Sequence, residues 1–250
     1  MTIHSSRQSF AGLDCRIIDA LPDGVQPRFL VVLCHGFGAP GDDLVDIGSW
    51  LAEASDTIAQ QFRFVFPAAP IDLAPFGMPG GRAWWPINMA RLAEINQTQD
   101  YEKLTTIRPD GMTEAATTLN SAIAEMQREW NLNDSQLILG GFSQGAMVST
   151  EVTLTLGRCP ALLLLFSGTL LCRDEWTGRA SAHPGCSVLQ SHGTIDPVLP
   201  FGPAEQLRDL LLENGFAVTF HPFRGQHTIP LEFLTDVAKQ LAEMASTSAD

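Results

Sequence analysis

The stretch LILGGFSQGAMVS, residues 137–149, carries the clearest structural signal in the chain. A run of branched apolar residues ends at two glycines, Ser143 follows, and a further glycine stands at position 145. The pattern G-x-S-x-G between a buried strand and a helix is typical of a nucleophile elbow, a tight turn that raises a serine hydroxyl above a sheet. The flanking glycines fit this interpretation, because such a turn leaves no room for side chains beside the serine. We therefore interpret Ser143 as a nucleophile.

The rest of the sequence alternates short apolar runs with longer amphipathic stretches. The expected strands are 14–19, 29–34, 62–66, 136–141, 161–166, 187–191 and 217–223. Helical periodicity fits 43–60, 113–130, 144–157, 203–214 and 230–246. This alternation predicts an α/β fold with a mostly parallel central sheet and helices on both faces, a three-layer sandwich. Such sheets place their chemistry in the loops at the carboxyl ends of the strands.

The length of the chain, 250 residues, suits one domain with a sizeable core. We expect residues 1–250 to form a single domain that contains a long segment, 67–112, rich in Pro and Gly. A connection of this length inside a compact domain is usually functional or disordered. Its aromatic residues argue against disorder, so we interpret 67–112 as a lid-like insertion at the substrate site.

Composition and charge narrow the class of protein. The formal net charge is −13 and no run of Lys or Arg occurs, so nucleic-acid binding is not expected. The N-terminus lacks the features of a signal peptide, and the longest apolar run, 161–166, is too short to cross a bilayer. We expect a cytoplasmic monomer or homodimer without stable membrane insertion. The five cysteines include no CxxC pair, which predicts reduced thiols rather than a disulfide scaffold.

A serine hydroxyl needs a neighbouring base, usually His, to act as a nucleophile at neutral pH. In folds with this elbow the chain order is Ser, acid, His, so the base should follow the last expected strand. His227 lies there on a glycine-containing loop, before a helix opened by Pro230. His221 falls inside the strand and is interpreted as structural. We therefore predict His227 as the base.

The acid should lie in the loop after the preceding strand, where SVLQSHGTIDPVLP places Asp196 before a proline. Its carboxylate would fix the tautomer of His227 and stabilise the imidazolium. Asp174 and Glu175 follow an earlier strand and are the alternatives, with Asp174 as the second choice.

A developing oxyanion needs two backbone N–H donors. One is expected at Gln144, directly after the serine and at the positive end of a helix dipole. The other is expected in the loop CHGFGAPGDDL after the 29–34 strand, where Phe37 is the natural donor. His35 in this loop is interpreted as structural.

The same loop contains a literal G-x-G-x-x-G, from Gly36 to Gly41, which is also a dinucleotide-binding pattern. Asp42 and Asp43 would repel a pyrophosphate at the start of the helix, and no acidic residue ends the next strand at FRFVFP. A dinucleotide-binding protein therefore stays a remote alternative, and we expect neither a cofactor nor a metal.

Apolar side chains in the 67–112 segment and shortly after the serine are candidates for the wall of an acyl-binding site. Packing in the core or anchoring of the loop would account for each of them equally well. The candidates are Phe76, Met78, Trp84, Trp85, Ile87 and Met147.

Five segments together resemble the phospholipase/carboxylesterase family, which has the α/β-hydrolase fold and includes the acyl-protein thioesterases. They are, in order, HGFGAPGDDL, RAWWPI, LILGGFSQGAMVS, SVLQSHGTIDPVLP and GQHTIP, and they span nearly the whole chain. The resemblance implies a Ser143–Asp196–His227 triad, oxyanion donors at Phe37 and Gln144, and hydrolysis of esters or thioesters without a cofactor.

Some features depart from this family pattern. Ala146 and Gln226 stand where other residues are common, and the segment after RAWWPI is longer than in the eukaryotic thioesterases, so substrate specificity does not carry over. We predict a serine hydrolase that cleaves carboxylic esters, thioesters or lysophospholipids with an apolar acyl part through an acyl-enzyme on Ser143. A catalytically silent ligand-binding protein of the same fold is the alternative. Such proteins usually lose the Ser or the His, and this chain has both.

Overall fold

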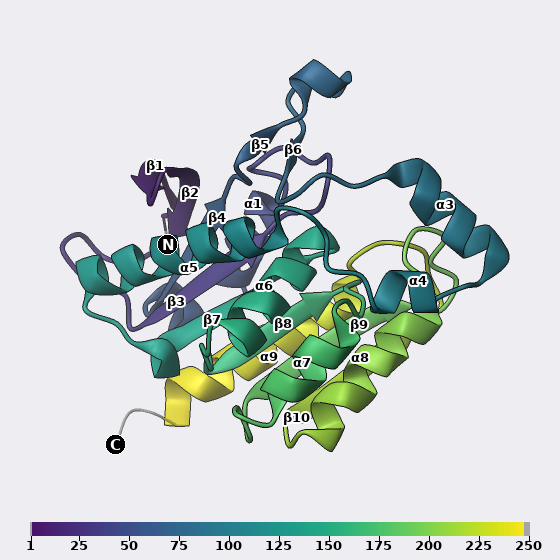
Figure 1. The fold of residues 1–250 in the computed structure, drawn as a ribbon. Coiled ribbons are helices and arrows are strands. Elements are labelled where there is room, and N and C mark those ends of the chain that lie inside the picture. The colour runs from purple at the N-terminus through teal and green to yellow at the C-terminus, as the bar shows by residue number, and fades with distance from the viewer. Residues whose placement is uncertain (1, 248–250) are drawn as a thin grey trace.

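The computed structural model describes residues 2–247, which are built around one large sheet (Figure 1). The strands of this sheet are β1 (His4–Phe10), β2 (Leu13–Asp19), β3 (Phe29–Cys34), β4 (Phe62–Pro67), β7 (Leu137–Phe142), β8 (Leu162–Phe166), β9 (Ser187–Gly193) and β10 (Ala217–Phe223). Their spatial order is β1-β2-β4-β3-β7-β8-β9-β10. β2 pairs antiparallel with β1 and β4, and every pair from β4 to β10 is parallel. The prediction of a mostly parallel central sheet is confirmed.

Helices cover both faces of the sheet (Figure 1). They are α1 (Val45–Glu53), α2 (Asp56–Ala59), α3 (Met89–Thr98), α4 (Glu102–Thr105), α5 (Met112–Trp130), α6 (Gln144–Thr155), α7 (Arg173–Ala180), α8 (Phe201–Glu213) and α9 (Leu231–Thr247), with short 3₁₀ turns η1 (Ala74–Phe76) and η2 (Asp134–Gln136). One apolar cluster joins the sheet to α5, α6, α7 and α8, and a second joins its other face to α1, α2 and α9. The three-layer arrangement is therefore also confirmed. Within the described residues, no helix combines the length and apolar character that a membrane span requires.

The central strands show why their sequences are continuous apolar runs. In β3, Leu30 and Val32 pack into the cluster under α5 and α6, whereas Val31 and Leu33 pack into the cluster under α1 and α9. Successive side chains of a strand point to opposite faces, and both faces of this sheet are covered. An apolar residue is therefore required at every position rather than at every second one.

Strand β1 is a local feature that the apolar pattern does not reveal. Its side chains from position 4 to 9 are exposed, so it shows no alternation of apolar and polar residues. The strand forms because Ala11 and Gly12 turn the chain back with φ of 47° and 81°. Positive φ at two consecutive central residues is typical of a type I′ turn. The twist of this turn matches the twist of the two strands that it joins.

One expected helix and one unexpected helix differ from the prediction for local reasons. The stretch 43–60 is divided into α1 and α2, because Ser55 is extended and its hydroxyl accepts a hydrogen bond from the N–H of Ile58, which starts a new helix. Helix α7 lay outside the predicted set, since only Trp176 and Ala180 of its residues are buried and the apolar periodicity is weak.

The 67–112 segment contains secondary structure of its own. A small hairpin of β5 (Ile71–Asp72) and β6 (Arg82–Ala83), with η1 at its tip, projects from the body of the molecule (Figure 1). Helices α3 and α4 follow on the side where the loops after β9 and β10 lie (Figure 1). The segment thus borders the carboxyl edge of the sheet.

The expectation of five reduced thiols is wrong for one pair. Cys159 and Cys186 form a disulfide across a sequence separation of 27, between the end of α6 and the start of β9. Their spacing matches no motif, so only the fold brings them together. The remaining cysteines are buried and free. Burial raises the pKa of Cys15 and of Cys172 to about 12 and keeps both thiols protonated.

Candidate active site

Ser143 lies on a tight turn between β7 and α6, with φ of 55° and ψ of −116°. Its N–H donates to the carbonyl oxygen of Phe166 at 2.9 Å, which ties the turn to the end of β8. A side chain at Gly141 or Gly145 would collide with the carbonyl oxygen of Cys34 at the end of β3. Both glycines are therefore required sterically, and the expected elbow geometry is present.

His227 and Asp196 form a close pair. Nδ1 of His227 lies 2.6 Å from Oδ2 of Asp196, and the carboxylate is fully shielded from solvent. The other carboxylate oxygen accepts the N–H groups of Val198 and Leu199 at 2.8 and 2.9 Å. These bonds fix the orientation of the Asp196 carboxylate, which accepts Nδ1–H of His227 and leaves Nε2 facing away from the acid and able to accept a proton.

The loops that carry these two residues are fastened to each other. β9 and β10 are parallel neighbours, Asp196 follows the first, and His227 follows the second. A side chain at Gly193 would overlap the backbone of Gly225, and the N–H of Ile195 donates to the carbonyl of Gly225 at 3.2 Å. The acid and the base are therefore positioned by one compact pair of loops.

The base loop also reaches the serine turn. The ring of His227 lies 4.7 Å, centroid to centroid, from the ring of Phe142, the residue before Ser143. The hydroxyl of Ser167, just after β8, donates to the carbonyl of Thr228 at 3.2 Å. Within residues 2–247 no hydrogen bond joins Ser143 to His227, and the serine is partly exposed. Catalytic hydrogen bonds are often long in free enzymes and shorten with substrate bound.

The loop after β3 packs against the serine turn on its other side. A Cβ placed on Gly36 would lie 3.3 Å from Cβ of Ser143, so the backbone of this loop directly adjoins the nucleophile. The predicted donors Phe37 and Gln144 thus flank Ser143, one in this loop and one at the first position of α6. In the described part of the chain neither backbone N–H donates to a protein carbonyl. Free N–H groups on both sides of a serine are what an oxyanion site needs.

The side chain of Gln144 has a role that the sequence did not reveal. It is fully buried, with Oε1 accepting the N–H of Trp84 at 2.9 Å and Nε2 donating to the carbonyl of Trp85 at 2.8 Å. The indole N–H of Trp84 donates to the carbonyl of His35 at 3.0 Å. The RAWWPI segment is thus bonded to the side chain of Gln144 and, through Trp84, to His35 in the loop that carries Phe37.

A cavity of about 420 Å³ lies near the serine turn, and its wall includes neither Ser143 nor His227. Its wall includes Trp85, Ile87 and Met147 from the predicted acyl-site residues. Met147 is one helical turn after Ser143, since its N–H donates to the Ser143 carbonyl at 3.2 Å. Further apolar wall residues are Leu92, Ile95, Leu104, Ile107, Leu171 and Leu199. The segment 85–110 therefore supplies most of the wall of an apolar chamber near Ser143.

The other predicted acyl-site residues lie outside this cavity. Trp84 is 1% exposed and is used to anchor the loop. Phe76 is 72% exposed at the tip of the projecting hairpin, and Met78 lies against Gly38 of the β3 loop.

A buried ion pair, missed by sequence reasoning, supports one side of the chamber. Glu151 on α6 is 1% exposed, accepts the indole N–H of Trp176 at 2.6 Å and pairs with Arg108 at 2.9 Å. Arg108 lines the cavity and also binds Glu175 on the surface. Glu151 is the one acidic residue in the otherwise apolar and small-polar sequence of α6. A buried acidic residue is almost always paired, so this position could have indicated an ion pair.

The rival candidates for acid and base have other partners or positions. Glu175 is bound to Arg108, and Asp174 is exposed in the first turn of α7. His221 on β10 faces Asp236 at 3.3 Å. The geometry thus favours Asp196 and His227.

Two buried histidines near the site are structural. His35 accepts the N–H of Ala69 at 3.0 Å on Nε2, and its Nδ1 lies 2.8 Å from the carbonyl of Gly36. His192 places Nε2 2.8 Å from the carbonyl of Leu199. Burial lowers the pKa of both imidazoles, so each is neutral and holds a loop in place.

The glycines of the G-x-G-x-x-G pattern are used for contacts within the protein. Gly36 adjoins Ser143, Gly38 lies near Met78, and a side chain at Gly41 would overlap Ala68. Among the described residues no group of three or more His, Cys, Asp or Glu is arranged to hold a metal ion.

Known proteins resemble this chain over most of its length. A family model described as Phospholipase/Carboxylesterase matches residues 21–245. Acyl-protein thioesterase 1 of Candida albicans is 31% identical over 87% of this chain and 92% of that protein. Acyl-protein thioesterase 1 of Debaryomyces hansenii is 29% identical over 82% and 87%, respectively.

Solved structures confirm the fold independently. The crystal structure of esterase PE8 matches with a TM-score of 0.74 at 24% identity, over 98% of this chain and 100% of that chain. A carboxylesterase from Mesorhizobium loti matches with a TM-score of 0.70 at 17% identity, over 95% and 98%.

Proposed function

This chain belongs to the phospholipase/carboxylesterase family and is an ester hydrolase with the α/β-hydrolase fold, and we propose that it works through an acyl-enzyme formed on Ser143. The observation that carries this proposal is the 2.6 Å pair of His227 and Asp196 beside the serine turn. A shielded carboxylate bonded to Nδ1 is the arrangement that makes a histidine a base toward a neighbouring serine.

The proposed reaction has two halves. Nε2 of His227 takes the proton of Ser143, whose oxygen attacks the acyl carbon, and the backbone N–H groups of Phe37 and Gln144 hold the oxyanion. The imidazolium then protonates the departing alcohol or thiol. In the second half His227 deprotonates a water molecule, whose oxygen attacks the acyl carbon. The imidazolium then returns the proton to the oxygen of Ser143 as the bond to the acyl group breaks and the acid is released.

The substrate class follows from the chamber beside the serine. Its wall is mainly apolar, so we propose an ester or thioester whose acyl part is an apolar chain. Residues 85–110 form much of this wall, which supports a lid-like role for the 67–112 insertion. The thioesterase name of the Candida albicans protein places a thioester among the substrates to test. The cytoplasmic location and the monomeric or homodimeric state stay predictions of the sequence.

The test combines labelling and turnover. We expect a fluorophosphonate probe to label the native protein, and Ser143→Ala to abolish labelling. With p-nitrophenyl esters, kcat/KM of Ser143→Ala or His227→Ala should fall by about a thousandfold or more. Ser135→Ala, on the turn before β7, is the matched control and should keep full labelling and activity. Absence of labelling in the native protein would overturn the assignment of Ser143.

A further inference from the structure

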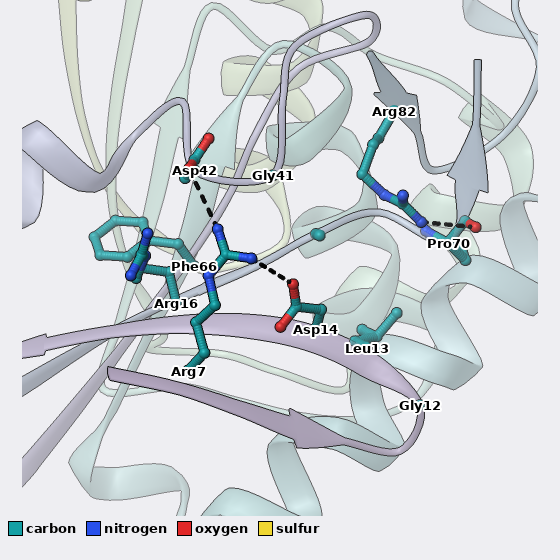
Figure 2. A pocket seen from close by; sticks show the side chains of 11 residues that line it. Arg7, Gly12, Leu13, Asp14, Arg16, Gly41, Asp42, Phe66, Pro70 and Arg82 are labelled. Atoms are coloured by element: carbon teal, nitrogen blue, oxygen red, sulfur yellow. Dashed lines mark hydrogen bonds and ion pairs between the residues drawn. The ribbon is translucent and has the colours of Figure 1, made fainter. Parts of the chain in front are cut away.

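Figure 2 shows the residues that line a second cavity, which has a volume of about 330 Å³. It is bounded by the β1–β2 hairpin, the end of β4, the loop after β3 and strand β6. None of its wall residues lines the acyl chamber or belongs to the proposed triad. Its volume falls at the lower end of the range for small-molecule sites, about 300–1,000 Å³.

Three arginines from three different strands line this cavity. They are Arg7 on β1, Arg16 on β2 and Arg82 on β6. The whole chain has only 15 Lys and Arg residues and a net charge of −13, so this grouping is not part of a generally basic surface. An anion is the class of ligand that such a grouping recognises.

Two of these guanidinium groups have no carboxylate partner within residues 2–247. Arg82 donates to the carbonyl oxygens of Ala69 and Pro70, which leaves three of its five N–H groups for a ligand. Arg16 makes one long bond to Ser5, at 3.4 Å, and its Nε is buried without a hydrogen-bond partner. A shielded, unpaired donor on a charged group is costly, and this cost is relieved if the Arg16 side chain turns toward the cavity and bonds to a ligand there.

The third arginine has acidic neighbours that a ligand can replace. Figure 2 shows Arg7 between Asp14, at 3.3 Å, and Asp42, at 3.7 Å. About half of each of these side chains is exposed, and exposed ion pairs of this kind are weak. Asp42 makes no hydrogen bond to Arg7, so it is the carboxylate that moves aside most easily.

The charges then identify the ligand. The wall holds three guanidinium groups and two carboxylates, Asp14 and Asp42, so its net charge is +1, and it rises to +2 when Asp42 turns away from the cavity. A phosphate monoester carries about −1.5 to −2 charges at pH 7 and presents three acceptor oxygens. A single carboxylate would satisfy only one of the three arginines. We propose that this cavity is a binding site for a small phosphate monoester, held by Arg7, Arg16 and Arg82.

The site adjoins the loop that carries a proposed oxyanion donor. The carbonyl of Arg82 accepts the N–H of Gly38, and the N–H of Arg82 donates to the carbonyl of Ala39, at 2.9 and 3.0 Å. Gly38 directly follows Phe37. A ligand that fixes Arg82 therefore also fixes this loop and raises the thermal stability of the protein.

The test is calorimetric titration of the full chain carrying Ser143→Ala, so that binding is measured without turnover. The titrants are glycerol 3-phosphate and inorganic phosphate, in a chloride buffer of low ionic strength. We expect saturable binding of glycerol 3-phosphate, at least tenfold weaker in Arg16→Gln and in Arg82→Gln. Asp42→Asn should bind several-fold more tightly, because it removes the competing carboxylate. Arg128→Gln, an exposed arginine on α5, is the control and should bind as the parent does.

Asp42→Asn is expected to bind more tightly, whereas the arginine variants are expected to bind more weakly. A misfolded variant could only lose binding, so tighter binding by Asp42→Asn cannot result from misfolding. Absence of binding in both the parent and Asp42→Asn would overturn the proposal, as would binding that none of these substitutions changes. A sedimentation arm with phosphatidylcholine vesicles containing phosphatidic acid identifies the source of the phosphate. Vesicle binding with the same dependence on Arg16 assigns it to a lipid headgroup, and binding of glycerol 3-phosphate alone assigns it to a free metabolite. Either outcome supports a phosphate site.

Discussion

Gln144 Oε1 accepts a hydrogen bond from the backbone N–H of Trp84 at 2.9 Å, so the residue after the proposed nucleophile holds a segment 60 positions earlier in the chain. The same side chain donates to the carbonyl of Trp85. The wall of the acyl chamber begins at Trp85, so the serine turn and the start of that wall are one hydrogen-bonded unit.

This unit makes the side chain of Gln144 a positioning group. Gln144→Met keeps the backbone N–H at this position but leaves two buried backbone groups without partners, at about 1–3 kcal/mol each. We expect a lower free energy of unfolding in urea and a fall of about tenfold or more in kcat for a long-chain ester. Gln206→Met, exposed on α8, should change neither. Unchanged kcat and stability in Gln144→Met would contradict this role.

Chain-length dependence tests the chamber. Each methylene that enters it contributes about 0.8 kcal/mol, or about fourfold in kcat/KM, until the chamber is full. Met147→Trp should fill part of the space, so that activity on octanoyl esters falls by about tenfold or more while activity on acetyl esters stays within about threefold. Leu212→Trp, exposed on α8, is the control. If Met147→Trp lost activity equally on octanoyl and acetyl esters, the acyl chain would not bind in this chamber.

Stability should depend on pH through the two buried histidines. Burial lowers the pKa of His35 and His192 below the ordinary 6.5, so the unfolded chain binds more protons than the folded one just below that pH. Protonation of these two histidines should therefore not lower the free energy of unfolding above about pH 6.5. Below about pH 6.5 the free energy of unfolding should fall as the pH drops. Urea unfolding between about pH 7.5 and 5.5 measures this slope. His35→Gln should reduce the slope of the unfolding free energy against pH. His4→Asn, at an exposed position, should leave this slope unchanged.

The ion pair under the chamber should contribute strongly to stability. Glu151→Ala leaves the indole of Trp176 and one side of Arg108 unpaired, and breaking such a buried pair costs about 3–5 kcal/mol. Glu151→Gln retains an acceptor for Trp176 and should cost less. Urea unfolding measures both, and Glu213→Gln at the exposed end of α8 should stay within about 0.5 kcal/mol of the parent. A loss no larger in Glu151→Ala than in that control would contradict the buried pairing.

The disulfide can be checked by counting thiols. Under denaturing conditions without reductant only the three free cysteines should react, and all five should react after reduction. Cys159→Ser removes a cross-link that contributes about 3–4 kcal/mol for a loop of this length, which corresponds to about 10 °C in Tm. Five reactive thiols before reduction would show that the bond does not form.

Sequence reasoning worked where a single local pattern dictates structure. The apolar runs of β3, β7 and β8 identify buried strands because those strands are covered on both faces. The order of Ser143, Asp196 and His227 follows from the elbow and from the rule that chemistry lies after parallel strands. Asp196 and His227 form a close pair, and the catalytic roles of all three residues stay predictions.

Features built from residues far apart in sequence were not predictable in the same way. The bond between Cys159 and Cys186 depends on where α6 ends and β9 begins. The grouping of Arg7, Arg16 and Arg82 depends on a hairpin whose first strand has no apolar pattern. In each case the local sequence is compatible with many arrangements, and only the packed sheet selects one.

The position of the Cys34 carbonyl between Gly141 and Gly145 has a consequence for redesign of the enzyme. Neither glycine can gain a side chain unless the end of β3 moves, and moving it would displace the loop of Phe37 as well. A substitution that moves the proposed nucleophile, Ser143, would therefore also move the loop of the proposed oxyanion donor, Phe37. Libraries aimed at new substrates should leave positions 141 and 145 unchanged and vary the chamber wall at 87–107, where side chains meet the acyl group without supporting the turn.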